Sequence, residues 1–394
     1  MLNPDSYMYG STPSAIRALF AYGLERKKEI GVDKVFDFSI GNPSIPAPKE
    51  VKESILKHLD EDPVSLHSYS MGNGLPHVRQ TIADWYKNEF DFPANPNHVY
   101  ITSGAAGALT ATLHAVTNPG DEVIVNAPFF AEYAVFIANC GCKHVKAYVN
   151  SSNAQLDPQS IKNCINKNTA AIIINSPNNP TGAIYSEENI KSVAAVLEEA
   201  QEKFGHDIYI ICDEPYKKIT YGDKVPFVPS IYKNTIICDS ASKSLSLPGE
   251  RIGHVYVSST ANDADSLSLA VAGAARSLGH VCAGVLFQKV YSDCFFLDSN
   301  VDAYAENRKL LTAIMDKIGW KYVEPQGAFY LWVKSPIADA QEFSKIAKKY
   351  ELLIVPSNSF GVEGWIRLGY CISKETIINS ESAFIKLAED IKNY

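Results

Sequence analysis

The chain has 394 residues, 46% of them hydrophobic and 20% charged, and its formal net charge is −8 at pH 7. A chain of this length exceeds what one hydrophobic core usually serves, so a larger and a smaller domain are expected. The acidic balance argues against a nucleic-acid partner, which normally requires concentrated lysine and arginine.

Membrane and metal sites are not expected either. The N-terminus lacks a basic stretch followed by an apolar one, and no apolar run approaches the ~20 residues that cross a bilayer. The eight cysteines are scattered through apolar segments, without Cys-x-x-Cys pairs or a histidine spacing suited to zinc. The sequence therefore predicts a cytoplasmic protein with reduced thiols, no membrane association and no metal.

The first part of the chain is predicted to form an arm and the beginning of the smaller domain. Residues 1–13 are polar and rich in turn-forming residues, which indicates an arm outside the core. Ser14 is a candidate N-cap for a helix that continues to Leu24. Residues 35–40 alternate like a strand and end in the turn Gly41-Asn42-Pro43.

From residue 51 onward, short apolar strands alternate with helical segments. Apolar residues at helical spacing predict helices over 51–59, 75–85, 105–116 and 187–204. Such alternation is typical of βαβ units and of a mostly parallel sheet covered by helices on both faces. The seven predicted strands span residues 98–103, 122–126, 144–149, 170–175, 208–212, 235–238 and 254–258.

After about residue 285 the pattern changes to that of a mixed α+β domain. A long helical stretch over 285–318 precedes a strand at 327–333. A helix at 342–350, strands at 352–355 and 365–370 and a closing helix follow. The predicted organisation is an arm (1–13), a large domain (47–284) and a small domain assembled from residues 14–46 and 285–394.

Open α/β sheets bind ligands outside the carboxyl ends of their strands, so the residues after each strand carry most information about function. The strand at 98–103 is followed by Gly104-Ala-Ala-Gly107, where small residues let backbone N–H groups approach an anion. Close helix–strand packing would explain these residues equally well. Phe130, after the strand at 122–126, could stack on a planar ring or belong to the core.

The next two strand ends carry an amide and a carboxylate. Ser176-Pro-Asn-Asn179-Pro180-Thr181-Gly182 is a rigid turn that presents an amide at a fixed place. Asp213 directly follows the apolar strand at 208–212, where a carboxylate is costly unless it is paired with a cation or a donor. Tyr216 lies three residues further on.

The stretch Asp239-Ser-Ala-Ser-Lys243 places a lysine among small hydroxyl residues just after a strand, and Arg251 follows eight residues later. A lysine amine becomes a nucleophile at neutral pH only if desolvation or nearby positive charge depresses its pKa. An ordinary solvated loop lysine is the alternative. Each strand end is ambiguous alone, but five in succession that face one crevice indicate a binding site.

Taken in this order, the motifs resemble those of the class I/II aminotransferases, pyridoxal 5′-phosphate (PLP) enzymes of the aspartate aminotransferase family and of fold type I. The resemblance covers nearly the whole chain, from Gly41-Asn42-Pro43 to Trp365-Ile-Arg367-Leu-Gly369. It implies a homodimeric enzyme that binds PLP between its two domains. The implied reaction moves the amino group of an α-amino acid to a 2-oxo acid by a ping-pong mechanism.

The resemblance also implies roles for individual residues. Lys243 would form an aldimine with PLP and then shuttle the substrate Cα proton. Asp213 would pair with the pyridine nitrogen, Tyr216 and Asn179 would hydrogen-bond the ring oxygen, and Phe130 would stack on the ring. The implied phosphate contacts are Gly104, Ala105, Ala106, Ser240, Ser242 and Arg251, with Tyr69 reaching the phosphate of the neighbouring subunit.

For the substrate, the resemblance implies that Arg367 binds the α-carboxylate, since its planar fork suits two carboxylate oxygens. Gly41 would add a backbone contact and Asn179 a side-chain contact. One branch of the family reads a distal carboxylate with a lysine where this chain has Ala105 and Ala106.

That lysine is absent here. A different branch of the family uses an arginine from the partner subunit, in the segment after the strand that follows Arg251, and Arg276 lies in a comparable stretch. Our hypothesis is that Arg276 or His280 contacts the substrate side chain across the dimer interface. A purely structural role for Arg276 is the alternative.

Two other functions fit the same motifs. A PLP-dependent lyase or decarboxylase would share the Lys, Asp and Arg set, because the outcome depends on which substrate bond is held perpendicular to the ring. A non-catalytic PLP-binding sensor is the more distant alternative. Sensors of that kind place a basic winged-helix module ahead of the domain, whereas this chain has only a short arm.

Overall fold

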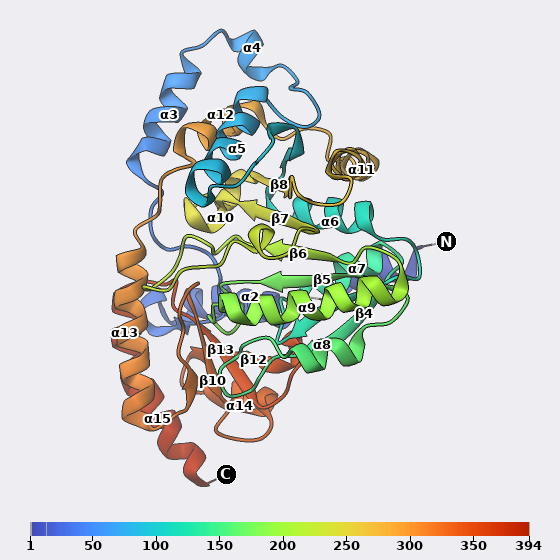
Figure 1. The fold of residues 1–394 in the computed structure, drawn as a ribbon. Coiled ribbons are helices and arrows are strands. Elements are labelled where there is room, and N and C mark those ends of the chain that lie inside the picture. Colours follow the sequence, from blue (N-terminus) through green and yellow to red (C-terminus); the bar gives the residue numbers. More distant parts are fainter. Residues whose placement is uncertain (1, 13, 394) are drawn as a thin grey trace.

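The computed structural model describes residues 2–12 and 14–393. Its centre is a seven-stranded sheet with the strand order β2-β8-β7-β6-β5-β3-β4 (Figure 1). Every neighbouring pair from β7 to β4 is parallel, whereas β8 runs antiparallel to both of its neighbours. The strands are β2 (Val99–Thr102), β3 (Glu122–Ala127), β4 (Lys143–Tyr148), β5 (Thr169–Asn175), β6 (Tyr209–Asp213), β7 (Thr235–Ser240) and β8 (Gly253–Val257).

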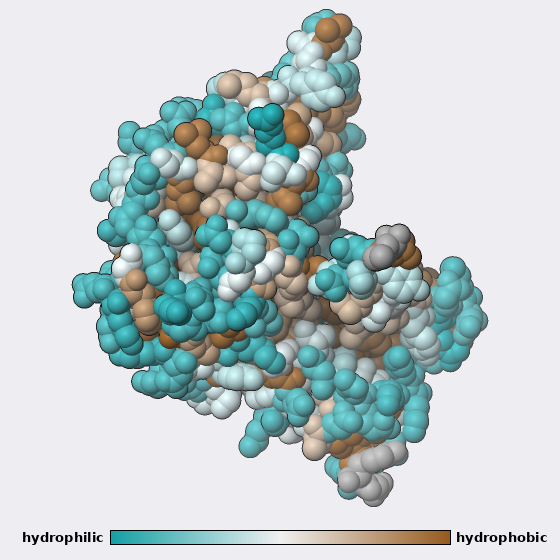
Figure 2. All heavy atoms as spheres, turned by 90° about the vertical axis from the view of Figure 1, so that its right-hand side faces the viewer, coloured by the Kyte–Doolittle hydropathy of each residue, from teal (hydrophilic) through white to brown (hydrophobic). Residues whose placement is uncertain are grey.

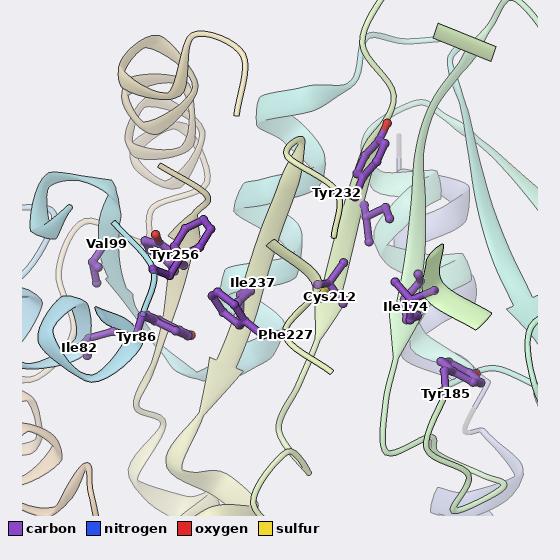
Figure 3. Close-up of a cluster of buried hydrophobic side chains, with 14 of the residues drawn as sticks. Ile82, Tyr86, Val99, Ile174, Tyr185, Cys212, Phe227, Tyr232, Ile237 and Tyr256 are labelled. Atoms are coloured by element: carbon purple, nitrogen blue, oxygen red, sulfur yellow. The ribbon is translucent and has the colours of Figure 1, made fainter. Parts of the chain in front are cut away.

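Helices cover both faces of this sheet, because successive strand residues point to opposite sides. Ile172 and Ile174 of β5 belong to one buried cluster, whereas Ile173 belongs to another. Figure 3 shows part of the first cluster. Residues of α3 (Lys49–Leu59), α5 (Pro76–Phe90), α8 (Pro158–Cys164), α9 (Glu187–Phe204) and α12 (Val285–Cys294) join the first, and residues of α6 (Gly104–Val116), α7 (Glu132–Asn139) and α11 (Ala264–Ser277) join the second.

A smaller α+β unit packs beside the sheet around a third buried cluster. It contains a four-stranded antiparallel sheet of order β12-β13-β10-β9 and a two-stranded parallel sheet of β1 and β11. Its strands are β1 (Phe36–Asp37), β9 (Tyr322–Val323), β10 (Tyr330–Lys334), β11 (Leu352–Leu353), β12 (Val355–Pro356) and β13 (Trp365–Gly369). Its helices are α2 (Ala15–Ile30), α13 (Val301–Ile318), α14 (Ala340–Lys348) and α15 (Lys374–Asp390).

The predicted fold class and all seven predicted strands of the large sheet are confirmed. The predicted cap of α2 is also correct, since the Ser14 side chain accepts a hydrogen bond from the Arg17 backbone N–H. Short helices for which no range was predicted from the sequence include α4 (Pro63–His67), α7, α8 and α10 (Ala241–Ser244).

Two predicted elements are interrupted. The helix expected over 285–318 is broken at residues 295–300, because the side chains of α12 pack into the large core while α13 packs on α15. The strand expected over 352–355 is divided at Ile354, since β11 pairs with β1 whereas β12 pairs with β13. The domain limits themselves stay a prediction, and the packing of α12 favours a boundary after this helix.

The N-terminal arm contains a helix, α1 (Pro4–Ser11), where only turns were expected. The Asn3 side chain caps it by accepting from the Ser6 N–H, and none of its residues is buried. Residues 1 and 13 of the arm lie outside the described residues. Among the helices that the structure describes, none combines the length and the apolar character needed to cross a membrane.

Figure 2 shows hydrophobic residues on one face in patches between hydrophilic ones, with a notch below the projection at the top. Figure 1 identifies that projection as the part of the chain that carries α3 and α4. In Figure 1, α4 therefore lies at the end of the molecule away from α14 and α15 of the smaller unit.

The packing of β7 gives a test of the core. Ile237 is fully buried, so we expect Ile237→Ala to lower the free energy of unfolding by about 2–5 kcal/mol. Ile378 on α15 is 48% exposed, and Ile378→Ala should change stability by only about 0.5 kcal/mol. Urea unfolding followed by circular dichroism measures both, and equal losses would contradict this account of the core.

Candidate active site

A cavity of about 720 Å³ lies where the carboxyl ends of the large sheet meet the smaller unit. Because β8 is antiparallel, the residues that precede it reach the same edge as the residues that follow β3, β5, β6 and β7. The predicted site residues that line the cavity are Gly41, Ala105, Ala106, Phe130, Asn179, Asp213, Tyr216, Ser240, Ser242, Lys243, Arg251 and Arg367.

Lys243 is the third residue of the short helix α10, which directly follows β7. Its amine donates a 2.6 Å hydrogen bond to the Gly41 carbonyl, and no carboxylate pairs with it among the described residues. Burial lowers the pKa of Lys243 to about 8, and the nearby positive charges of Arg367 and Arg251 act in the same direction. A neutral, nucleophilic amine is therefore available close to physiological pH.

Asp213 ends β6 and is buried. Its Oδ2 accepts a hydrogen bond from the Tyr133 hydroxyl, whereas its Oδ1 has no partner among the described residues. Burial raises the pKa of Asp213 to about 7, while the Tyr133 hydrogen bond opposes that rise. A buried carboxylate oxygen without a donor is costly, so a donor on a ligand would complete this group.

Arg367 on β13 is only 2% exposed and has no acidic partner among the described residues. Its Nη1 donates to the Asn179 side chain at 3.1 Å and its Nη2 to the Ser39 carbonyl at 2.7 Å. Its Nε has no partner, and its guanidinium lies 4.5 Å from the centre of the Tyr330 ring. A buried cation held only by neutral groups favours an anionic ligand.

The helix α6 begins at the same edge with Gly104, Ala105 and Ala106. Gly104 has a φ of +80°, and a Cβ there would lie 2.7 Å from Nη2 of Arg251. Glycine is therefore favoured by the positive φ, and a Cβ there would also displace the end of the Arg251 side chain. The N-terminus of α6 next to Arg251 offers N–H groups and positive charge, which suit a phosphate.

Four predicted residues do not line this cavity: Gly104, Tyr69, Arg276 and His280. Gly104 remains adjacent through Arg251, as described above. Tyr69 is 96% exposed on the loop after α4, and Arg276 is exposed near the end of α11. The roles assigned to these residues stay predictions.

Several residues at the cavity were not assigned a role from the sequence. Tyr133 contacts Asp213, and Asn175 donates to the Asp213 carbonyl while accepting from the Asn179 N–H. The Tyr330 hydroxyl lies 3.0 Å from that of Tyr216. Tyr133 lies three residues after Phe130, which precedes α7, and the two rings are in edge-on contact with centroids 5.5 Å apart.

The burial of Lys243 predicts a distinctive pH dependence of its reactivity. With a pKa of about 8, its amine is mostly protonated below pH 8 and mostly neutral above it. Trace acetylation with acetic anhydride, followed by peptide mass spectrometry, should give half-maximal labelling of Lys243 near pH 8. Free Nα-acetyl-lysine is the reference, with a pKa of about 10.4. Half-maximal labelling at pH 10 or above would contradict the burial of this amine.

Comparison with known proteins identifies the family. Residues 33–379 match the family described as aminotransferase class I and II. The chain is 30% identical to the aspartate aminotransferase of Pyrococcus horikoshii over 389 aligned residues. This alignment covers 96% of this chain and 95% of that protein. The chain is 28% identical over 381 residues to the aspartate/prephenate aminotransferase of Thermus thermophilus, with 95% and 96% covered.

A solved structure of an amino transferase from Eubacterium rectale superimposes with a TM-score of 0.97 at 44% identity, covering 99% of both chains. The resemblance inferred from the motifs is therefore confirmed over nearly the whole sequence. Amino acids and 2-oxo acids are the substrates that such relatives imply, and the family is one that uses PLP. The chain belongs to the class I and II aminotransferases and is an enzyme of amino-group transfer.

Proposed function

We propose that the cavity binds PLP together with the α-amino acid or the 2-oxo acid between which the amino group moves. One observation carries this proposal: two buried groups and one half-buried group that lack charged partners line the same cavity. They are the amine of Lys243, Oδ1 of Asp213 and the guanidinium of Arg367. An aldehyde, a pyridine N–H and a carboxylate are the respective groups that would complete them.

The surrounding residues fit the cofactor. When bound, PLP supplies a carbonyl for the amino group and a ring that delocalises the electrons left at Cα. Asp213 would accept the ring N–H, Phe130 would stack on the ring, and Tyr216 and Asn179 would donate to its oxygen. The phosphate would be held by Ala105, Ala106, Ser240, Ser242 and Arg251, which line one side of the cavity.

The substrate would be oriented by Arg367 and Gly41. The guanidinium would bind the α-carboxylate, for which Nε is still available, and would keep its hydrogen bonds to Asn179 and Ser39. With the carboxylate fixed, the neutral amine of Lys243 would remove the proton from Cα and pass it to the cofactor, and it would carry a proton in the opposite direction in the second half-reaction. Its lowered pKa matches this task at neutral pH.

We further propose that two copies of the chain form the working enzyme. Tyr69 is almost fully exposed and does not line the cavity of its own chain. This placement supports the prediction that it reaches the phosphate site of a second copy. The predicted cytoplasmic location stays a prediction.

A half-reaction screen tests the function. We expect PLP-loaded protein to be converted to the pyridoxamine form by suitable amino acids and restored by a 2-oxo acid, as followed by absorbance. Lys243→Ala should slow this conversion by about 10²–10⁴-fold, because the Cα proton then lacks its base. Lys345→Ala, at an exposed position on α14, should have little effect.

Two other outcomes would replace the proposal. Release of ammonia, sulfide or carbon dioxide without conversion would favour the lyase or decarboxylase alternative. Protein that binds PLP but gives no spectral response to any amino acid would favour the sensor.

The Tyr133 contact yields a separate prediction. Tyr133→Phe removes the donor that opposes the raised pKa of Asp213, so this pKa should rise further above about 7. We expect the half-reaction to slow by about 10- to 100-fold at pH 7, as for loss of a hydrogen bond to a charged group, and to recover at higher pH. Tyr256→Phe, which removes a hydroxyl that contacts Ser259, is the control. A loss independent of pH would contradict the assigned role.

A further inference from the structure

Some residues that line the cavity have no role in the proposed binding of the cofactor and of the α-carboxylate. Among them are Ile16, Arg17 and Phe20 of α2, together with Leu109 of α6 and Phe136 of α7. Arg17 is the one cation in the cavity lining to which the proposed function gives no task, since Lys243, Arg251 and Arg367 are assigned.

Arg17 is only weakly held. Its Nη2 lies 3.5 Å from Oε1 of Glu132, and this is the single side-chain contact of its guanidinium among the described residues. The Arg17 side chain is 69% exposed and that of Glu132 is 28% exposed. A long, exposed ion pair of this kind is readily exchanged for a better anion.

The position of the pair is fixed by well-formed elements. Arg17 lies in the first turn of α2, whose start is set by the Ser14 cap, and Glu132 is the first residue of α7. Glu132 is followed directly by Tyr133, which contacts Asp213. An acidic group on the substrate would therefore meet Arg17 at a defined place relative to the reacting centre.

From this geometry, and resting on the proposed function, we infer that Arg17 determines side-chain specificity by binding the distal carboxylate of a dicarboxylic amino acid. Glu132 holds the guanidinium in the absence of substrate and is exchanged for that carboxylate. The methylene groups of the substrate would then pass the apolar side chains of Ile16 and Leu109. A guanidinium suits this role because its fork can bind both carboxylate oxygens.

This inference differs from the earlier hypothesis about Arg276 and His280. Those two residues do not line the cavity of their own chain, whereas Arg17 does. The two hypotheses are distinguishable, because each predicts that a different variant loses the preference for acidic substrates.

The test compares substrates that differ only in charge. We expect Arg17→Ala to lower kcat/KM for aspartate by about 10- to 100-fold while that for asparagine changes little, as for loss of a charge-assisted hydrogen bond. Arg17→Lys should retain part of the preference, and Glu132→Gln should strengthen it by removing the competing anion. Lys28→Ala removes one positive charge from the exposed side of the same helix and is the matched control.

Binding without turnover provides an independent measurement. Calorimetric titration of the PLP-loaded protein with maleate, a dicarboxylate without an amino group, should show a Kd about 10- to 100-fold higher in Arg17→Ala than in wild type. Equal losses for aspartate and asparagine, or an unchanged Kd for maleate, would overturn the inference. Turnover of an amino acid with a cationic side chain that is lost in Glu132→Gln would overturn the inference as well. If no amino acid reacts, the proposed function is wrong, and maleate binding still decides on Arg17.

Discussion

The hydrogen bond between the Lys243 amine and the Gly41 carbonyl is the contact around which the site is assembled. It joins the end of β7 in the large sheet to the turn after β1 in the smaller unit. A buried amine requires an acceptor, but a carboxylate in that place would hold the proton on lysine and suppress its nucleophilicity. A backbone carbonyl satisfies the amine without that penalty. Gly41 is suited to the position because a Cβ there would clash with the Tyr330 hydroxyl.

Asp213 and Arg367 are likewise held by neutral partners and, among the described residues, not by groups of opposite charge. Each is buried with part of its hydrogen-bonding capacity left unused. Neutral donors and acceptors, from Tyr133, Asn179 and Ser39, hold the two side chains instead. Charges kept apart in this way retain their capacity for a ligand, at a cost in the stability of the free protein.

The sequence predicted what is encoded locally. Apolar runs defined the seven strands, and motifs at their ends identified the lining residues at the edge of the large sheet, because a parallel sheet brings carboxyl ends to one edge. The place of Arg367 was implied by the family resemblance and not by such a motif. Contacts made only in three dimensions were missed. The break before α13 depends on which core each helix joins, and Tyr133 and Arg17 became visible only when α7 and α2 were placed beside the cavity. The α1 helix was missed because Asn3 caps a segment that has no buried face.

The contacts of Arg367 have a consequence for how firmly the large and the smaller unit are held together. Its guanidinium donates to Asn179 in the turn after β5 and to Ser39 in the N-terminal segment, and it lies over Tyr330 of β10. A carboxylate bound there would tighten the geometry of all three segments at once. By thermodynamic linkage, the arrangement that binds the carboxylate best is also the one that the carboxylate stabilises. Under the proposed function, the substrate would thus act as a temporary cross-link between the two halves of the molecule.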